Sequence, residues 1–73
     1  MSAVVAIGER DLLDGFSLAG VRVEYATDPE ECRRALADIG EDVGLLVLTP
    51  SSRRALEPLL ERRPNLLWTA VFG

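Results

Sequence analysis

Two side chains that carry much of protein chemistry are missing from this sequence. None of its 73 residues is histidine, and its eight basic residues are all arginine, so lysine is missing too. The commonest metal ligand and neutral-pH proton shuttle is therefore absent, as are the amine of a Schiff base and the lysine of a Walker-type phosphate loop. One cysteine cannot form an internal disulfide. These absences exclude most enzyme chemistry, and we predict no catalytic residue, cofactor or metal.

Positive charge and long apolar runs are also scarce. Twelve carboxylates outnumber the eight arginines, which leaves a net charge of −4 and a pI near 4.6. Nucleic acid is therefore not an expected partner, because phosphate contacts need clustered positive charge. No apolar run approaches the roughly 20 residues that span a bilayer, and the N-terminus lacks the basic region of a signal peptide. We expect a cytoplasmic protein without direct membrane insertion.

Aromatic residues amount to only 5% of the chain, whereas 48% of the residues are apolar and 27% are charged. This balance is typical of a globular protein with an aliphatic core. A chain of this length forms one domain, which we take to span 1–73, and it buries only about 60–65% of the surface that its unfolded form exposes. It is too short to form a deep enzyme cleft between two lobes.

Short apolar runs alternate with amphipathic stretches along the whole sequence. The runs predict four strands, at Ala3–Ile7, Val21–Tyr25, Val43–Leu48 and Leu66–Phe72. Apolar residues at helical spacing predict three helices, namely Asp11–Leu18, a second from Pro29 to Ile39, and a third that opens at Thr49-Pro50 and ends before Pro64. Residues expected to face the core are Leu12, Leu13, Phe16 and Leu18, then Cys32, Ala35, Leu36 and Ile39, then Ala55, Leu56, Leu59 and Leu60.

Local signals mark the helix ends. Asp28-Pro29-Glu30-Glu31 combines an N-cap aspartate, a proline at the first helical position and a glutamate at the third. Asp11 is expected to cap the first helix, and Pro58 is expected to kink or split the third. Ala19-Gly20 and Gly40 are natural stops for the first and second helices.

Strands that alternate with helices imply a parallel sheet with right-handed crossovers. The sequence therefore predicts an α/β fold, a small doubly wound four-stranded sheet of order 2-1-3-4 with three helices, similar to Rossmann and receiver domains. On the last strand, Trp68, Ala70 and Phe72 should point to one face, and Leu67, Thr69 and Val71 to the other. One row is expected to lack a cover from this chain. Large apolar patches mark interfaces, so we expect the final strand to meet another protein or a second copy.

Three carboxylates follow the first strand, at the carboxyl edge where open α/β sheets bind ligands. Glu9, Asp11 and Asp14 could hold Mg²⁺ as in a phospho-receiver domain. A receiver also needs an aspartate at the end of the third strand, where this chain has Leu48-Thr49-Pro50, and a distant lysine, which is missing. A solvated helix start is the favoured interpretation. Gly8 could begin a phosphate-binding turn, but a dinucleotide fingerprint needs two closely following glycines.

The cysteine and the arginine pairs also have plain structural interpretations. Cys32 lies in the first turn of its helix, a position that favours a modest lowering of its pKa. Because the chain has no histidine to pair with it, a buried small hydrophobe is the favoured interpretation. Arg53-Arg54 and Arg62-Arg63 lie among glutamates at helical spacing, which favours a solvated, self-paired face. A contact with a protein partner is the alternative.

The opening of the chain resembles a known family. Gly8-Glu9-Arg10-Asp11, followed by Gly15-Phe16-Ser17-Leu18-Ala19-Gly20-Val21, is similar to the start of the F subunit of V-type ATPases and ATP synthases. The residues that mark the family are Gly8, Glu9, Arg10, Asp11, Gly15, Phe16, Leu18, Ala19 and Gly20. The order of strands and helices extends the resemblance over nearly the whole chain.

This resemblance implies a non-catalytic component of the central rotor stalk. Such a protein binds the D-subunit shaft within the hexamer of catalytic and regulatory subunits, and it couples ATP turnover to transport of protons or sodium ions. It is peripheral to the membrane as part of the complex. Trp68, Phe72 and Val71 are then the expected apolar anchors to the shaft, or to a second copy when the chain is isolated.

Two departures from the family pattern stand out. Family members usually run longer, with a C-terminal helical segment, so this chain resembles a short form. Glu9 stands where aspartate is commoner. The alternative hypotheses are a stand-alone receiver-like adaptor or regulatory domain without enzymatic activity, and a small thiol enzyme that uses Cys32.

Overall fold

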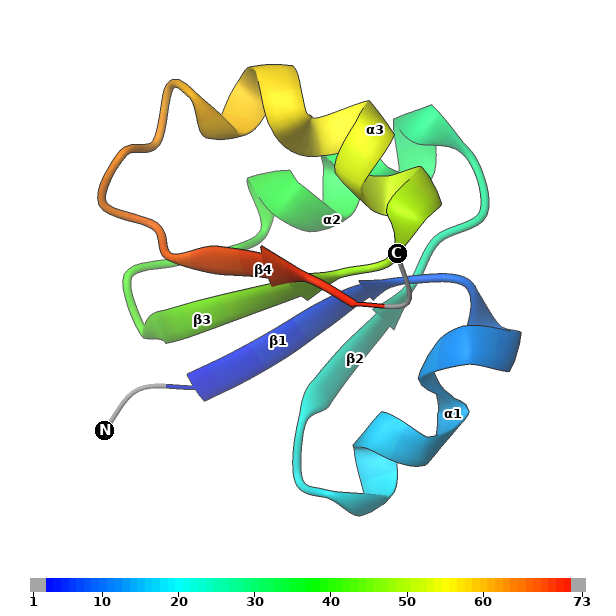
Figure 1. Ribbon diagram of the computed structural model, residues 1–73. Helices are drawn as coiled ribbons and strands as arrows, with labels where there is room; N and C mark the ends of the chain where they lie inside the picture. Colours follow the sequence, from blue (N-terminus) through cyan, green and yellow to red (C-terminus); the bar gives the residue numbers. More distant parts are fainter. Residues whose placement is uncertain (1–2, 72–73) are drawn as a thin grey trace.

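Four parallel strands and three helices follow one another in strict alternation in the computed structural model (Figure 1), which describes residues 3–71, with residues 17 and 18 described by backbone alone. The elements are β1 (Ala3–Gly8), α1 (Arg10–Leu18), β2 (Arg22–Tyr25), α2 (Pro29–Ala37), β3 (Val43–Leu48), α3 (Pro50–Leu60) and β4 (Trp68–Ala70). The sheet order is β2-β1-β3-β4 with every pair parallel, which confirms the predicted α/β topology.

The two central strands are the two most apolar ones. β1 and β3 pair in a register that sets Ile7 beside Leu48, and both side chains are fully buried. β4 is shorter than the predicted Leu66–Phe72. The amide of Leu66 donates to the carbonyl of Arg63 at 3.0 Å, so this residue closes a turn after α3 and does not join the ladder. Phe72 lies outside the described residues.

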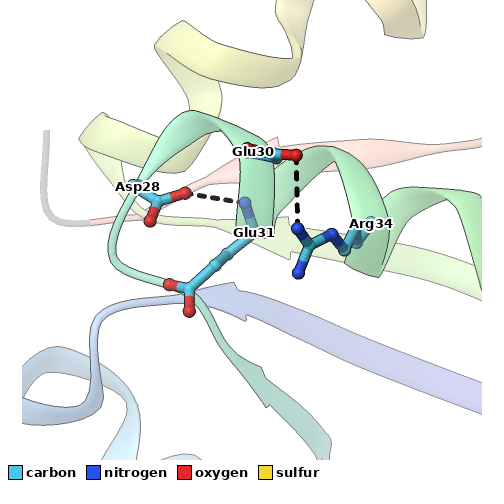
Figure 2. A network of polar contacts seen from close by, with 4 residues as sticks. All are labelled: Asp28, Glu30, Glu31 and Arg34. Carbon is cyan, nitrogen blue, oxygen red and sulfur yellow. Dashed lines mark hydrogen bonds and ion pairs between the residues drawn. The ribbon is translucent and has the colours of Figure 1, made fainter.

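The start of α2 follows its predicted signal. The Asp28 carboxylate accepts a hydrogen bond from the Glu31 amide at 2.8 Å (Figure 2). Pro29 occupies the first turn. Glu31 in turn accepts from the amide of Thr27 at 2.8 Å. One turn on, Arg34 pairs with Glu30 at 3.2 Å on the exposed face, a contact that contributes little. The helix ends at Ala37 and not at Ile39.

The other two helices each depart from expectation in one respect. α1 begins at Arg10, and Asp11 lies inside its first turn and not at the cap. The amides of Leu12 and Leu13 donate to the carbonyl of Glu9, so the helix starts directly after β1. Pro58 does not split α3, which runs from Pro50 to Leu60. Pro58 has no amide hydrogen to donate, so one backbone hydrogen bond of α3 is missing. Because Pro58 lies near the end of the helix, this loss affects only its last turn.

The helices cover the two faces of the sheet unequally. α2 and α3 lie on one face and α1 on the other, beneath β1 and β2 (Figure 1). The larger core cluster lies under α2 and α3 and consists of Val5, Ile7, Ala26, Cys32, Leu36, Ile39, Val43, Leu46, Leu48, Leu56 and Leu60. The smaller one, beneath α1, has only three buried members, Ala6, Leu13 and Val47. No helix within residues 3–71 is long and apolar enough to cross a membrane.

Candidate functional site

A polar network joins β1 to β3 at the carboxyl edge of the sheet. The hydroxyl of Thr49, which is fully buried, donates to the Glu9 carboxylate. The Ser52 hydroxyl donates to the carbonyl of Ile7 at 2.7 Å and accepts from the amide of Thr49 at 2.9 Å. A Cβ on Gly8 would collide with the side chain of Thr49, so glycine is required for this close approach. These contacts fix the loop that carries the family-marking residues.

The Glu9 carboxylate is committed to this network. The hydrogen bond from Thr49 holds the pKa of Glu9 below its ordinary value, with smaller help from Ser51 and from the positive charge of Arg54, against partial burial that opposes them. A carboxylate that is ionised and already engaged is poorly suited to act as a general acid near neutral pH. The arrangement therefore stabilises the sheet edge.

A pH dependence follows from this lowered pKa. Because the folded pKa of Glu9 lies below its ordinary value of 4.5, its contribution to stability is present above that value and is lost as the pH falls through the folded pKa. We expect Glu9→Gln to be less stable than the wild type at pH 7, and the difference to shrink as the pH falls below the ordinary value of 4.5 and through the lowered pKa of Glu9. Urea unfolding across pH 3–7 measures this difference. Glu41→Gln, which removes an exposed carboxylate outside the network, is the control, and a constant gap between wild type and Glu9→Gln would contradict the expectation.

The other two carboxylates of the predicted cation cluster do not converge on Glu9. Asp11 is exposed on α1. Asp14 accepts a hydrogen bond from the Tyr25 hydroxyl at 2.9 Å and lies 3.9 Å from Arg10, whose guanidinium stacks 4.0 Å above the Tyr25 ring. Across residues 3–71, no group of three or more His, Cys, Asp or Glu side chains could hold a metal ion. The geometry thus gives the receiver-like interpretation no support.

Cys32 is buried against the larger core cluster. Burial raises the pKa of its thiol, and the nearby carboxylates of Asp28 and Glu9 raise it further. The expectation that the first turn of α2 lowers the pKa of Cys32 was therefore wrong. A thiol that resists ionisation is a poor nucleophile, so the structure favours the small buried hydrophobe.

The arginine pairs separate into different roles. Arg53 pairs with Glu57 at 3.0 Å, as predicted for a self-paired face. Arg63 instead reaches across to α2 and donates to the carbonyls of Leu36 and Ile39 at 3.2 and 3.0 Å. Arg54 has no carboxylate within ion-pair distance in the described chain. Sequence periodicity could not reveal these differences, because the partners of Arg63 are distant in sequence.

Two of the family-marking residues, Gly8 and Gly20, are needed for the conformation of the backbone. Gly8 permits the contact with Thr49, and Gly20 adopts a φ of 84° in the turn that follows α1. Phe16 packs against the smaller core cluster. The remaining ones, Arg10, Asp11, Gly15 and Ala19, are exposed on or just after α1, and the side chain of Leu18 lies outside the described part of the chain.

The face of the sheet opposite α2 and α3 is only half covered. On β4, Trp68 packs against the larger core cluster, whereas Leu67 just before it is 67% exposed. Val71 packs partly against the smaller cluster and Val4 is 36% exposed. We call the uncharged strip formed by Val4, Leu45, Leu67, Thr69 and Val71 the open sheet face. The sequence predicted Val71 as an apolar anchor and did not predict Leu67. The alternation of β4 separates its side chains into two rows, but it does not indicate which row the helices cover.

Comparisons with known proteins agree with the resemblance seen in the sequence. A family model described as ATP synthase (F/14-kDa) subunit matches residues 4–66. Among solved structures, the chain is similar to the F subunit of the V-type ATP synthase from Archaeoglobus fulgidus, with 26% sequence identity and a TM-score of 0.61. That match covers 93% of this chain and 96% of the other. A comparison with curated proteins finds no match.

Proposed function

The chain belongs to the ATP synthase (F/14-kDa) subunit family, and from that premise we propose that it binds the D-subunit shaft in the central stalk of a V-type ATP synthase. It is the non-catalytic F subunit of such a complex. In this role it couples ATP turnover in the hexamer of catalytic and regulatory subunits to transport of protons or sodium ions. It lies peripheral to the membrane, with which it is associated only as part of the complex.

The observation that supports this proposal beyond the family match is the open sheet face. In a protein of this size an apolar strip without a cover usually marks an interface. Leu67, at 67% exposure, is the most exposed large apolar side chain in the described chain. Val71, Trp68 and Phe72 remain proposed anchors, with Trp68 contributing from the helix-covered side of β4 where it is partly buried.

Co-expression with the D subunit tests the proposal. We expect a stable one-to-one complex by size-exclusion chromatography with light scattering. Leu67→Arg introduces a charge into the open sheet face and should weaken this complex at least tenfold, because an uncompensated charge is costly to bury. Ala37→Arg adds the same charge to the exposed end of α2, on the opposite side of the sheet, and should leave the complex intact.

The outcomes separate two questions. A wild-type chain that ignores the D subunit would defeat the proposed function itself. A complex that survives Leu67→Arg would keep the function and move the interface away from the open sheet face. A homodimer of the isolated chain that Leu67→Arg dissolves would show that a second copy can occupy the same strip.

A further inference from the structure

The outer edge of β4 has unused hydrogen-bonding groups. β4 is the last strand in the sheet order and pairs only with β3. The carbonyl of Leu67 accepts from the amide of Leu46 at 2.9 Å, and the amide of Val71 donates to the carbonyl of Leu48 at 2.8 Å. Because successive residues of a strand present their backbone groups to opposite sides, the amides and carbonyls of Trp68 and Ala70 point away from β3. No described strand lies on that side.

The two edges of the sheet differ in how they are protected. β2, at the opposite edge, carries Arg22 and Glu24 among its four residues, and charged side chains are a common guard against edge pairing. β4 has the residues Trp68-Thr69-Ala70, with no charge and no proline. By this criterion β4 is the edge open to a further strand.

A hollow lies alongside this edge, beneath the first turns of α3. It has a volume of about 320 Å³ and is lined by Pro50, Arg53, Arg54, Glu57 and Ala70. The guanidinium of Arg53, one of the lining residues, lies 5.8 Å from the centre of the Trp68 ring. A strand added next to β4 would direct the side chain opposite Ala70 to the same face of the sheet as Ala70 itself, and therefore into this hollow.

The charged side chains that line the hollow indicate which kind of side chain it would bind. Arg53 is already paired with Glu57. Arg54 has no ion-pair partner within residues 3–71. Its positive charge acts on Glu9 only at longer range, and the Glu9 carboxylate is itself hydrogen-bonded to Thr49. A carboxylate delivered into the hollow would meet an unpaired guanidinium at the N-terminal end of a helix, where negative charge is favoured.

We propose that the outer edge of β4 binds an extended, acidic segment of a partner protein, which adds a fifth strand to the sheet and places one carboxylate on Arg54. This mode combines main-chain hydrogen bonds with one selective pocket. A second copy of the chain is the poorer occupant, because β4 contains no acidic residue to meet Arg54. The site differs from the open sheet face, because it uses the outward backbone groups of Trp68 and Ala70 and not the row of Leu67, Thr69 and Val71. Trp68 is the one residue that it shares with the proposed anchors to the D-subunit shaft.

Titration of the ¹⁵N-labelled chain with short peptides tests this proposal. The probes are capped heptapeptides of alternating threonine and valine, with a single glutamate at each of the five central positions in turn, and matched peptides with glutamine there. We expect at least one glutamate peptide to shift the amide signals of Trp68 and Ala70, and to bind about fivefold more tightly than its glutamine counterpart. Arg54→Gln should abolish that preference, and Arg62→Gln, which removes an exposed arginine after α3, should preserve it.

Three results would overturn the proposal. The Trp68 and Ala70 amides could remain unperturbed by every peptide, or the glutamate and glutamine peptides could bind wild type equally. Slow exchange of these two amides in the peptide-free chain, together with a dimer by light scattering, would assign the edge to a second copy. Leu67→Arg should weaken the complex with the D-subunit shaft and leave peptide binding unchanged, whereas Arg54→Gln should abolish the glutamate preference and leave that complex intact, so the two proposals can fail separately.

Discussion

Replacing Gly8 by alanine is expected to destabilise the chain by about 1–3 kcal/mol. The added Cβ would overlap the Thr49 side chain, which is fully buried and hydrogen-bonded to Glu9, so it cannot turn aside without breaking the polar network. In a domain of this size the whole free energy of unfolding is on the order of 5 kcal/mol. The midpoint of thermal unfolding should fall by roughly 4–8 °C for each kcal/mol lost.

The matched control is the same substitution in α1. A Cβ on Gly15 would meet nothing within 4 Å, and alanine is favoured over glycine in a helix by about 1 kcal/mol. Gly15→Ala should therefore raise the midpoint while Gly8→Ala lowers it. Thr49→Ser, which removes the γ-methyl group, should recover part of the Gly8→Ala loss in the double variant. Equal effects of the two glycine substitutions would contradict the close approach seen between β1 and Thr49.

Truncation of Leu13 to alanine is the second substitution with a large expected effect, a loss of about 2–5 kcal/mol. Leu13 is the only residue of α1 that is fully buried in the described chain, and the smaller core cluster is built around it with Ala6 and Val47. Its loss leaves a cavity on a face that has few other apolar contacts. Urea unfolding followed by circular dichroism measures the effect.

Leu67→Ala is the control for this truncation because it removes the same atoms from a side chain that is 67% exposed. Its effect on the free energy of unfolding should stay within about 0.5 kcal/mol. If Leu13→Ala and Leu67→Ala lowered the free energy of unfolding equally, the packing of α1 against the sheet would not depend on Leu13. Hydrogen exchange would then show whether α1 opens alone while the β1–β3 centre stays protected.

Periodicity and caps predict the architecture well because their causes are local. The apolar runs around Ile7 and Leu48 mark buried strands, and the Asp28-Pro29 signal places the start of α2 at the residue where the helix begins. Alternation with helices then leaves a parallel sheet as the natural arrangement. Errors arise at element ends, where competing hydrogen bonds decide, as for Asp11 in α1 and for Leu66 before β4.

Features that join distant parts of the chain escape the same reasoning. The hydrogen bond between Thr49 and Glu9 links residues 40 positions apart, and neither residue has a local pattern that announces it. The use of Arg63 to hold the end of α2 is equally long-range. Which row of β4 faces solvent depends on the side that α3 takes, so Leu67 could not be separated from Trp68 in advance.

The strand order also dictates when the chain can fold during its synthesis. β1 leaves the ribosome before the other described strands, yet its principal neighbour β3 comes only after α1, β2 and α2. Until β3 emerges, Val5 and Ile7 have no partners on the larger face, and the short ladder with β2 must stand without a core. Such non-local pairing is slow and leaves apolar strands exposed. We therefore expect the nascent chain to stay unfolded until β3 and α3 are available, and then to acquire its core in one step, with β4 added last at the rim.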